Sequence, residues 1–328
     1  MSESSIGPMV NPALGASHTP EHDTPKARRN RRRGRLENGQ QAPGGGERLL
    51  TGLVLLLCCL AVVIPFMGVI STSISSAEHV NQMGGFVLWP DGIDLSAYRS
   101  VLAGGVVTRA LMVSIGVTVV GTILSLAASA MMAFGLSRPG SLGHKPILMV
   151  VLFSLLFSPG LIPSYLTVKQ VGLLDSYWAL ILPGLVSAFN IIVLRSFFMN
   201  IPQELFESAR IDGASDWSVF TRLVLPLSKA VLAVIGLFYA VGYWNAFFGA
   251  LIYLSDQGKW PLTLILRTYL VDNQQLSTAD LGAGVDTLPP QPALQMAMLL
   301  IAVAPILFVY PFLQKHFTTG MLTGAVKG

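Results

Sequence analysis

Most informative for the fold is the run Glu207-Ser208-Ala209-Arg210-Ile211-Asp212-Gly213-Ala214, followed by Leu223-Val224-Leu225-Pro226. The run is charged and interrupted by glycine, yet a long apolar stretch lies on either side of it. A chain that keeps so polar an insert between two apolar stretches is expected to use it for docking a partner outside the bilayer. The partner then decides the function.

The composition of the 328 residues excludes an ordinary soluble domain. Hydrophobic residues make up 52% and charged residues only 12%, with a mean hydropathy of +0.61, whereas soluble domains carry about 25% charged residues. Crossing a bilayer takes about 20 apolar residues in a helix, which bonds its own backbone groups. We therefore expect an all-α membrane protein with six transmembrane helices, one in each stretch that lacks Asp, Glu, Lys and Arg: 49–77, 110–137, 146–168, 176–194, 230–255 and 287–314.

The distribution of Lys and Arg predicts the orientation of these helices. If the N-terminus is cytoplasmic, sixteen of the 21 basic residues lie on the cytoplasmic side. Cytoplasmic loops of membrane proteins carry such an excess of basic residues. Both termini, and the polar insert, are therefore expected in the cytoplasm.

Residues 1–48 are expected to form a disordered basic cytoplasmic tail, because they are rich in Pro, Gly and Ser and show no apolar periodicity. Their basic cluster, residues 26–35, is best explained as a topology signal, with a tether to anionic lipid as the alternative. No nucleic-acid partner is expected. Cys58 and Cys59 are neighbours on one helix and cannot readily pair. The histidines have no metal-ligand spacing, so neither a metal nor a cofactor is expected.

The chain lacks the residues that two common energy sources would need. Ion-coupled carriers commonly use buried ionisable groups, and the six stretches contain none, although backbone and amide oxygens could still bind sodium. A phosphate-binding loop is also missing, since the nearest fragment, Gly258-Lys259, continues with Trp260. We expect no catalytic residues, and any ATP hydrolysis must belong to another chain.

Four polar or aromatic residues within the apolar stretches are candidates for a translocation path: Asn190, Tyr243, Trp244 and Asn245. A path for a sugar would combine aromatic faces with amide groups that form hydrogen bonds. Helix packing and an interfacial aromatic belt explain the same residues equally well. Both interpretations stay open at the level of sequence.

Small residues and prolines predict how the helices pack and bend. Gly121, Ser125, Ser129 and Ala133 recur every four residues, which predicts a smooth helix face that another backbone approaches closely. Prolines inside apolar stretches should kink or locally unwind their helices. Pro65, Pro183 and Pro305 are predicted to act in this way.

The insert itself is predicted to be a helix-turn-helix on the membrane surface. Pro202 suits the first turn of a helix that ends near residue 211, and Gly213 can adopt the left-handed conformation that stops it. Ser215 or Asp216 can cap a second helix, which Pro226 should close. Such a hairpin fits a partner's groove or rests on lipid headgroups. The apolar side chains that we expect it to present are Leu205, Phe206, Ala209, Trp217 and Phe220.

The spacing of the insert resembles the "EAA" coupling loop of bacterial ABC importer permeases, which has Glu-Ala-Ala, three residues, Gly, nine residues and Ile-x-Leu-Pro. Here Ser208 stands for an alanine and Leu223 for the isoleucine. Other runs resemble the carbohydrate-uptake branch, and within it the polysaccharide and oligosaccharide permeases of the LplC/YtcP group. The resemblance covers roughly residues 50–328, most clearly at 173–183, 209–214, 243–245, 310–315 and 324–328.

The resemblance implies a division of labour in a bacterial inner (plasma) membrane. An extracytoplasmic solute-binding protein delivers a carbohydrate, most simply an oligosaccharide, to a path between two permease subunits in the lipid. Two cytoplasmic ATPase subunits drive the transport. An ABC importer permease for a non-sugar solute is the main alternative, and an ion-coupled secondary sugar carrier is a weaker one.

The resemblance also implies a type I ABC importer permease fold with defined segments. A first transmembrane helix at 49–77 and an extracytoplasmic loop at 78–105 precede the transmembrane domain at 106–314, and a cytoplasmic tail follows at 315–328. The coupling hairpin occupies residues 201–226. Within it the implied roles are polar anchoring for Glu207 and Asp212, the turn for Gly213, and packing for Leu205, Ala209 and Leu225, before Pro226.

Overall fold

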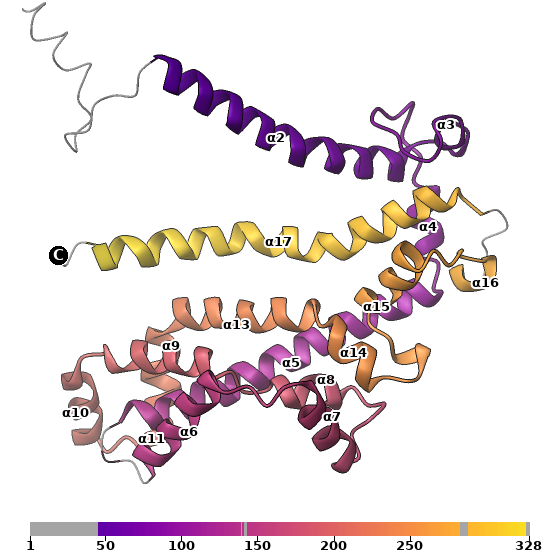
Figure 1. Cartoon of the computed structure of the whole chain (residues 1–328). Coiled ribbons are helices and arrows are strands. Elements are labelled where there is room, and N and C mark those ends of the chain that lie inside the picture. Colours follow the sequence, from indigo (N-terminus) through magenta and orange to yellow (C-terminus); the bar gives the residue numbers. More distant parts are fainter. Residues whose placement is uncertain (1–44, 139, 141–142, 283–287, 326–328) are drawn as a thin grey trace, which may run out of the picture. The chain divides into compact units, whose positions relative to one another are not determined.

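The computed structural model describes residues 45–138, 140, 143–282 and 288–325, and every regular element in these ranges is a helix (Figure 1). The all-α prediction is confirmed for them. The chain divides into two compact units, residues 1–63 and 64–328. Helix α2 (Gly45–Ile74) begins in the first unit, four residues before the helix was expected to start. The basic cluster at 26–35 lies outside the described residues.

The second unit contains the other helices in the following order. The first half comprises α3 (Ala77–Gln82), α4 (Ser96–Val101), α5 (Val106–Ser137), α6 (His144–Leu156), α7 (Leu161–Gln170), α8 (Trp178–Ile181), the 3₁₀ turn η1 (Leu182–Gly184) and α9 (Ala188–Met199). The second half comprises α10 (Gln203–Ile211), α11 (Asp216–Val219), the π-helical turn η2 (Phe220–Val224), α12 (Leu225–Leu227), α13 (Lys229–Trp244), α14 (Phe247–Tyr253), η3 (Gln257–Lys259), α15 (Leu262–Leu266), η4 (Arg267–Val271), α16 (Thr278–Leu281) and α17 (Gln291–Ala325).

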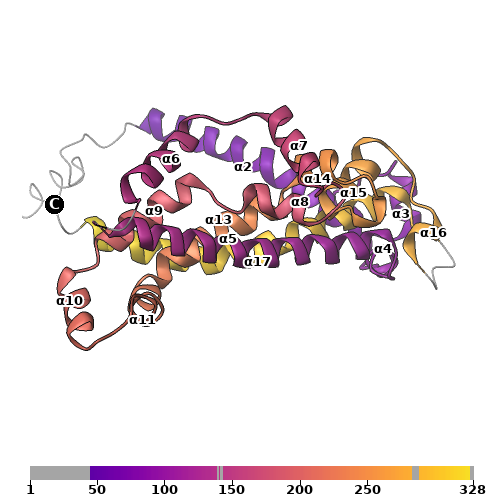
Figure 2. The same ribbon diagram turned by 90° about the horizontal axis from the view of Figure 1, so that it is seen from below.

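Helix α5 is the central element of the second unit. Its buried residues recur every three or four positions, as in Ser114, Val117, Gly121 and Ser125, so one stripe of the helix faces other protein. That stripe packs against α13 and α9, and the beginning of α5 packs against α15. Figures 1 and 2 both place α10 and α11 at one end of α5, and α4 and α16 at its other end.

Two clusters of buried apolar side chains stabilise the two ends of this arrangement. One lies around α4, the start of α5, α15 and the start of α17, where Leu262, Leu281 and Leu294 are fully buried. The other joins the rest of α5 to α9, α13 and the insert, with Ile191 and Ile235 fully buried. The insert is therefore packed on the same core as the helices around it.

Three described helices are long and apolar enough to cross a bilayer: Leu49–Ile74, Val106–Ser137 and Gln291–Val309. Two further pairs qualify only as bent spans. The pair Trp178–Gly184 and Ala188–Met199 bends by 50°, and the pair Asp216–Leu227 and Lys229–Trp244 bends by 85°. Length and composition thus give three to five candidate spans in the described residues, fewer than the six expected.

The predicted third, fourth and fifth stretches are each interrupted, and prolines lie at the breaks in the third and the fourth. Between α6 and α7, Pro159 lacks a backbone N–H and Gly160 has a φ of +80°, so neither continues a helix. Pro183 lies at the break between α8 and α9, as predicted. By contrast, α2 continues past Pro65 and α17 past Pro305 without interruption. The expected C-terminal tail is helical as far as Ala325.

Candidate functional site

The first arm of the insert is helix α10, and a glycine cap ends it. The N–H of Gly213 donates to the carbonyl of Arg210 at 3.0 Å, and the N–H of Ala214 donates to the carbonyl of Ala209 at 2.9 Å. This pair of bonds is a Schellman motif, which needs a left-handed residue at the turn. Gly213 has a φ of +74°, so the turn predicted for it is present. Pro202 lies one residue before the helix rather than in its first turn.

The second arm begins at Ser215 and extends further than predicted. The Ser215 hydroxyl accepts from the N–H of Ser218, which caps α11. Pro226 was expected to close this arm, but the helical run continues to Leu227. The π-helical turn η2 immediately before it provides the reason, because a wider turn accommodates a proline that would clash with an α-helical carbonyl. The chain then bends by 85° into α13.

The apolar side chains of the hairpin divide differently from the prediction. Phe220 is buried, and Phe206 and Ala209 are half-buried against the core formed by α5, α9 and α13, so these three do not face outward. The exposed apolar residues are Leu205, Trp217 and Ile211, the last with 86% of its surface accessible. The exposure of Ile211 was not predicted from the sequence. Its position between Arg210 and Asp212, at the end of a helix, could have indicated that its side chain is exposed.

An ion pair attaches the hairpin to the end of α5. The guanidinium of Arg138 bonds to the carboxylate of Asp216 and also lies over the rings of Phe134, at 4.4 Å, and Phe206, at 5.2 Å. The rings of Phe134 and Phe220 are 5.0 Å apart. One arginine therefore connects α5 to both arms of the hairpin, a contact between distant residues that sequence spacing could not reveal.

The two carboxylates to which the resemblance gave an anchoring role have no such contact within the described chain. Neither the Glu207 carboxylate nor the Asp212 carboxylate forms a hydrogen bond or ion pair with a described residue, and both residues are exposed. Glu207 lines a cavity of about 380 Å³ at the foot of the first arm, together with Arg138 and Arg210. Asp216, rather than Glu207 or Asp212, forms the ion pair that joins the hairpin to α5.

The smooth face of α5 receives two tyrosine side chains rather than another backbone. The hydroxyl of Tyr243 lies 2.8 Å from the Ser125 hydroxyl, and that of Tyr239 lies 2.6 Å from the Ser129 hydroxyl. A Cβ atom on Gly121 would come within 2.8 Å of the Tyr243 ring. The predicted face is correct, but its small residues make room for aromatic side chains from α13.

The four candidate path residues separate into two groups. Asn190 and Tyr243 line one cavity of about 370 Å³, together with Ser187 and Tyr239. The Asn190 side chain is buried and makes no hydrogen bond to a described residue. Trp244 points elsewhere, since its indole N–H donates to the carbonyl of Ala302 on α17 at 3.1 Å.

Asn245 is also apart from that cavity. Its side-chain amide is exposed and donates to the carbonyl of Val241 on its own helix at 2.9 Å. The amide therefore bonds back to its own helix at the end of α13 and not into the cavity. Only Asn190 and Tyr243 of the four are brought together.

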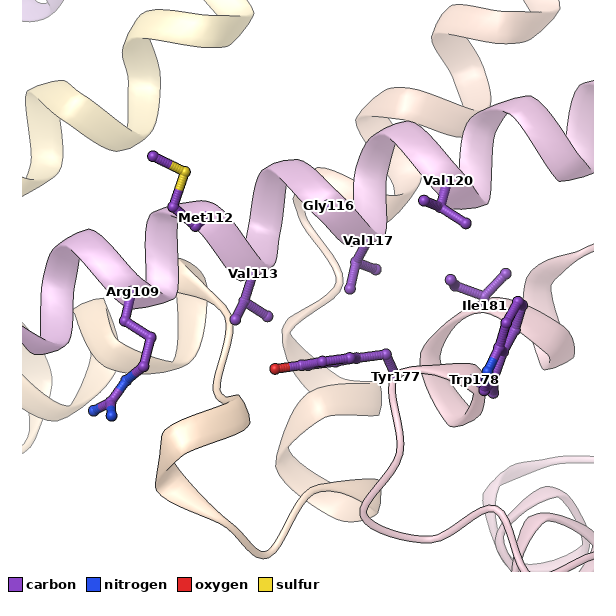
Figure 3. Close-up of a pocket in the computed structure, with 9 residues that line it drawn as sticks. All are labelled: Arg109, Met112, Val113, Gly116, Val117, Val120, Tyr177, Trp178 and Ile181. Atoms are coloured by element: carbon purple, nitrogen blue, oxygen red, sulfur yellow. The ribbon is translucent and has the colours of Figure 1, made fainter.

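A larger cavity, of about 490 Å³, was not predicted from the sequence. Figure 3 shows Arg109, Val113 and Val117 projecting from α5 on one side, with Tyr177 and Trp178 from the start of α8 opposite them. Apart from Arg109, apolar and aromatic side chains dominate its wall. The two aromatic residues belong to the run 173–183, which provided the only signal of this site in the sequence.

A polar cluster links two loops next to this cavity. Asp175 has a φ of +58°, and its carboxylate accepts from the N–H groups of Ser255, at 3.2 Å, and Asp256, at 3.0 Å. The Lys259 ammonium donates to the same carboxylate at 2.7 Å. The hydrogen bond from Lys259 lowers the pKa of Asp175 below 3.8, and the same bond raises the pKa of Lys259 above 10.5. Both groups are therefore charged at neutral pH.

The described residues contain no group of three or more His, Cys, Asp or Glu that could hold a metal ion.

Residues 110–323 match the family described as "Binding-protein-dependent transport system inner membrane component". The chain belongs to this family. The matched range contains the whole hairpin, the cavity beside Asn190 and the Asp175 cluster, so the features described above are parts of a permease.

Two relatives of this permease come from Bacillus subtilis. One is the "Polygalacturonan/rhamnogalacturonan transport system permease protein YtcP", 46% identical over 84% of this chain and 96% of the relative. The other is "Protein LplC", 45% identical over 81% of this chain and 90% of the relative. The resemblance to this group, inferred from the sequence, is thereby confirmed.

One solved structure resembles the permease closely in fold. It is a chain of a bacterial ABC transporter involved in the import of the acidic polysaccharide alginate, with a TM-score of 0.75 and 30% identity. The match covers 85% of the permease and all of that chain. The fold is thus that of an ABC importer permease, and the relatives are transport proteins rather than enzymes.

Proposed function

We propose that this permease is one of two permease subunits in an ATP-driven, binding-protein-dependent importer for a carbohydrate, most simply an oligosaccharide. The names of the relatives support this substrate class: one belongs to a polygalacturonan and rhamnogalacturonan system, and the solved structure belongs to an alginate importer. A solute-binding protein outside the membrane would deliver the sugar, in keeping with the family description. Two separate ATPase subunits would supply the energy.

The observation that carries the proposal is the construction of the hairpin. Its turn is capped by its own backbone, and Arg138 attaches it to α5 through Asp216. Its exposed surface combines Ile211 and Trp217 with the carboxylates of Glu207 and Asp212. A rigid hairpin with apolar side chains and outward charges is suited to insertion into a groove of a partner, here an ATPase.

The proposed topology keeps six spans and two cytoplasmic termini in a bacterial inner membrane. The helices α2, α5 and α17 provide three spans, and α6 with α7 provides another that is broken at Pro159. The α8 and α9 pair and the α13 and α14 pair complete the six. The 85° bend supports this arrangement, because it turns the chain from a hairpin along the membrane surface into a helix that enters the membrane.

We limit the proposed translocation path to the cavity shared by Asn190 and Tyr243. Its other polar groups include Ser187 and Tyr239. Hydroxyl and amide groups beside aromatic rings match the alternating polar and apolar faces of a sugar. Trp244 and Asn245 are excluded, because each is bonded away from the cavity.

Reconstitution tests the function. The permease would be placed in proteoliposomes with its partner permease and the ATPase subunits, and uptake of labelled oligogalacturonides would be compared with uptake of a labelled peptide. We expect sugar uptake that requires both ATP and the binding protein. Sugar uptake that persists without the ATPase subunits would overturn the proposal, and uptake of the peptide alone would overturn the substrate class.

A further inference from the structure

The break between α8 and α9 leaves backbone groups that the helices themselves do not bond. In a continuous α-helix the Ile181 carbonyl would accept from the N–H of Leu185, but that N–H donates to Leu182 instead, at 3.2 Å. The N–H of Ser187, at the start of α9, lacks a helical acceptor as well. A buried break of this kind needs other partners for these groups.

Two tyrosine side chains from α13 provide those partners. The Tyr243 hydroxyl donates to the Ile181 carbonyl at 3.1 Å, and the Tyr239 oxygen accepts from the Ser187 N–H at 3.0 Å. The two hydroxyls therefore bond to the two sides of the break, one to the end of α8 and one to the beginning of α9. The two helices meet at 50°, and both tyrosine hydrogen bonds are formed at this angle.

The same two hydroxyls also form hydrogen bonds with serine hydroxyls of α5. Because Tyr243 gives its only proton to Ile181, the Ser125 hydroxyl must donate to Tyr243 across their 2.8 Å contact. Ser129 completes the second chain through Tyr239. Both serines are fully buried, so water cannot readily replace a lost partner.

Helix α13, which carries both tyrosines, continues directly from the second arm of the hairpin. The arm ends at Leu227, Ser228 is fully buried at the 85° bend, and α13 begins at Lys229. A displacement of the hairpin therefore reaches the tyrosines through one covalent connection. From α13 the hydroxyl bonds connect it to the end of α8 and to the beginning of α9. The other end of α9 is joined directly to the first arm of the hairpin, through residues 200–202.

We propose that Tyr239 and Tyr243 are positioning residues that set the angle between α8 and α9 and transmit movement of the hairpin to the cavity beside Asn190. This inference rests on the proposed function for its link to ATP hydrolysis. Its structural part, the control of the angle by two hydroxyls, stands on the hydrogen bonds alone. The two parts can be tested separately.

The first experiment measures the angle in the purified permease. Spin labels would be attached at cysteines replacing Trp178 and Phe197, which are both exposed, in a chain whose Cys58 and Cys59 are changed to serine. We expect Tyr239→Phe and Tyr243→Phe to shift or broaden the distribution of distances between the labels. An unchanged distribution in both variants would overturn the proposal, whether or not the permease transports a sugar.

The matched control is Tyr253→Phe. Tyr253 is also buried, and it stacks on Tyr165 with ring centroids 6.3 Å apart, but its hydroxyl makes no hydrogen bond to a described residue. We expect this variant to keep the wild-type distance distribution. If it changes the distribution as much as the other two variants do, removal of any buried hydroxyl has that effect and the proposal is wrong.

The second experiment measures sugar imported per ATP hydrolysed by the reconstituted importer. We expect Tyr239→Phe or Ser129→Ala to lower this ratio by roughly fivefold, about the worth of one hydrogen bond, and the double variant to lower it no further. Strictly additive effects, or an unchanged ratio in an importer that couples normally with the wild-type chain, would overturn the transmission role. Lack of any ATP-dependent uptake by the wild-type chain would instead contradict the proposed function.

Discussion

The turn at Gly213 allows the hairpin to be perturbed without disturbing any neighbouring side chain. Its φ is +74°, and a Cβ atom added there would have no heavy atom within 4 Å. A substitution therefore acts through backbone strain alone. The left-handed conformation costs an L-residue about 1–2 kcal/mol, and a β-branched residue more, whereas asparagine tolerates it.

We therefore predict that Gly213→Val weakens binding of the ATPase subunit by about tenfold, because ~1.4 kcal/mol corresponds to a factor of ten. Gly213→Asn should change the affinity by much less. Affinity would be measured by titrating labelled ATPase into permease held in nanodiscs. Membrane insertion should be the same for both variants, since the site is exposed. Equal affinities of the valine variant and the wild type would refute the role of this turn in docking.

Two further substitutions test packing and charge. Gly121→Ala should destabilise the purified permease by about 1–3 kcal/mol, through overpacking of the tyrosine ring against it. Gly135→Ala on the same helix has open space and should not destabilise the permease, because alanine favours a helix more than glycine does. Thermal unfolding compares the two variants, and equal losses of stability would contradict the packing. Folding lowers the pKa of Asp175 below its ordinary value of 3.8. Its charged carboxylate therefore contributes to the free energy of unfolding above pH 3.8, and this contribution is lost as the pH falls through the pKa of the folded state. Folding raises the pKa of Lys259 above its ordinary value of 10.5. Its charged ammonium therefore contributes to the free energy of unfolding below pH 10.5, and this contribution is lost as the pH rises through the pKa of the folded state. The loss of stability caused by Asp175→Asn should therefore be constant from about pH 5 to about pH 9, and a marked pH dependence in that range would contradict this assignment.

The sequence predicted those features that depend on local patterns. Composition identified an all-α membrane protein, and the spacing around Gly213 located a capped hairpin whose turn has the expected conformation. The face of α5 that includes Gly121 was also recognised from four-residue spacing. Each of these follows from the conformation of a few neighbouring residues.

What the sequence did not predict depends on contacts between distant residues. The burial of Phe220 follows from its packing on Phe134, and the anchoring role of Asp216 follows from Arg138, which lies 78 positions away. The separation of Trp244 from Tyr243 has a similar cause, because Trp244 bonds to Ala302 on α17 whereas Tyr243 bonds to Ser125 on α5. The breaks in the apolar stretches appear only when the backbone partners of each break are known.

Cross-linking from the hairpin tests most directly the claim that it docks on an ATPase. A photoreactive group would be attached at a cysteine replacing Ile211, which is 86% exposed, and, as a control, at one replacing Trp89, which is 75% exposed in a loop proposed to lie outside the membrane. Both would be made in a chain without Cys58 and Cys59, in the assembled importer. We predict that residue 211 cross-links to the ATPase subunit and residue 89 does not. Absence of that product from residue 211 in an intact complex would contradict the docking role of the hairpin.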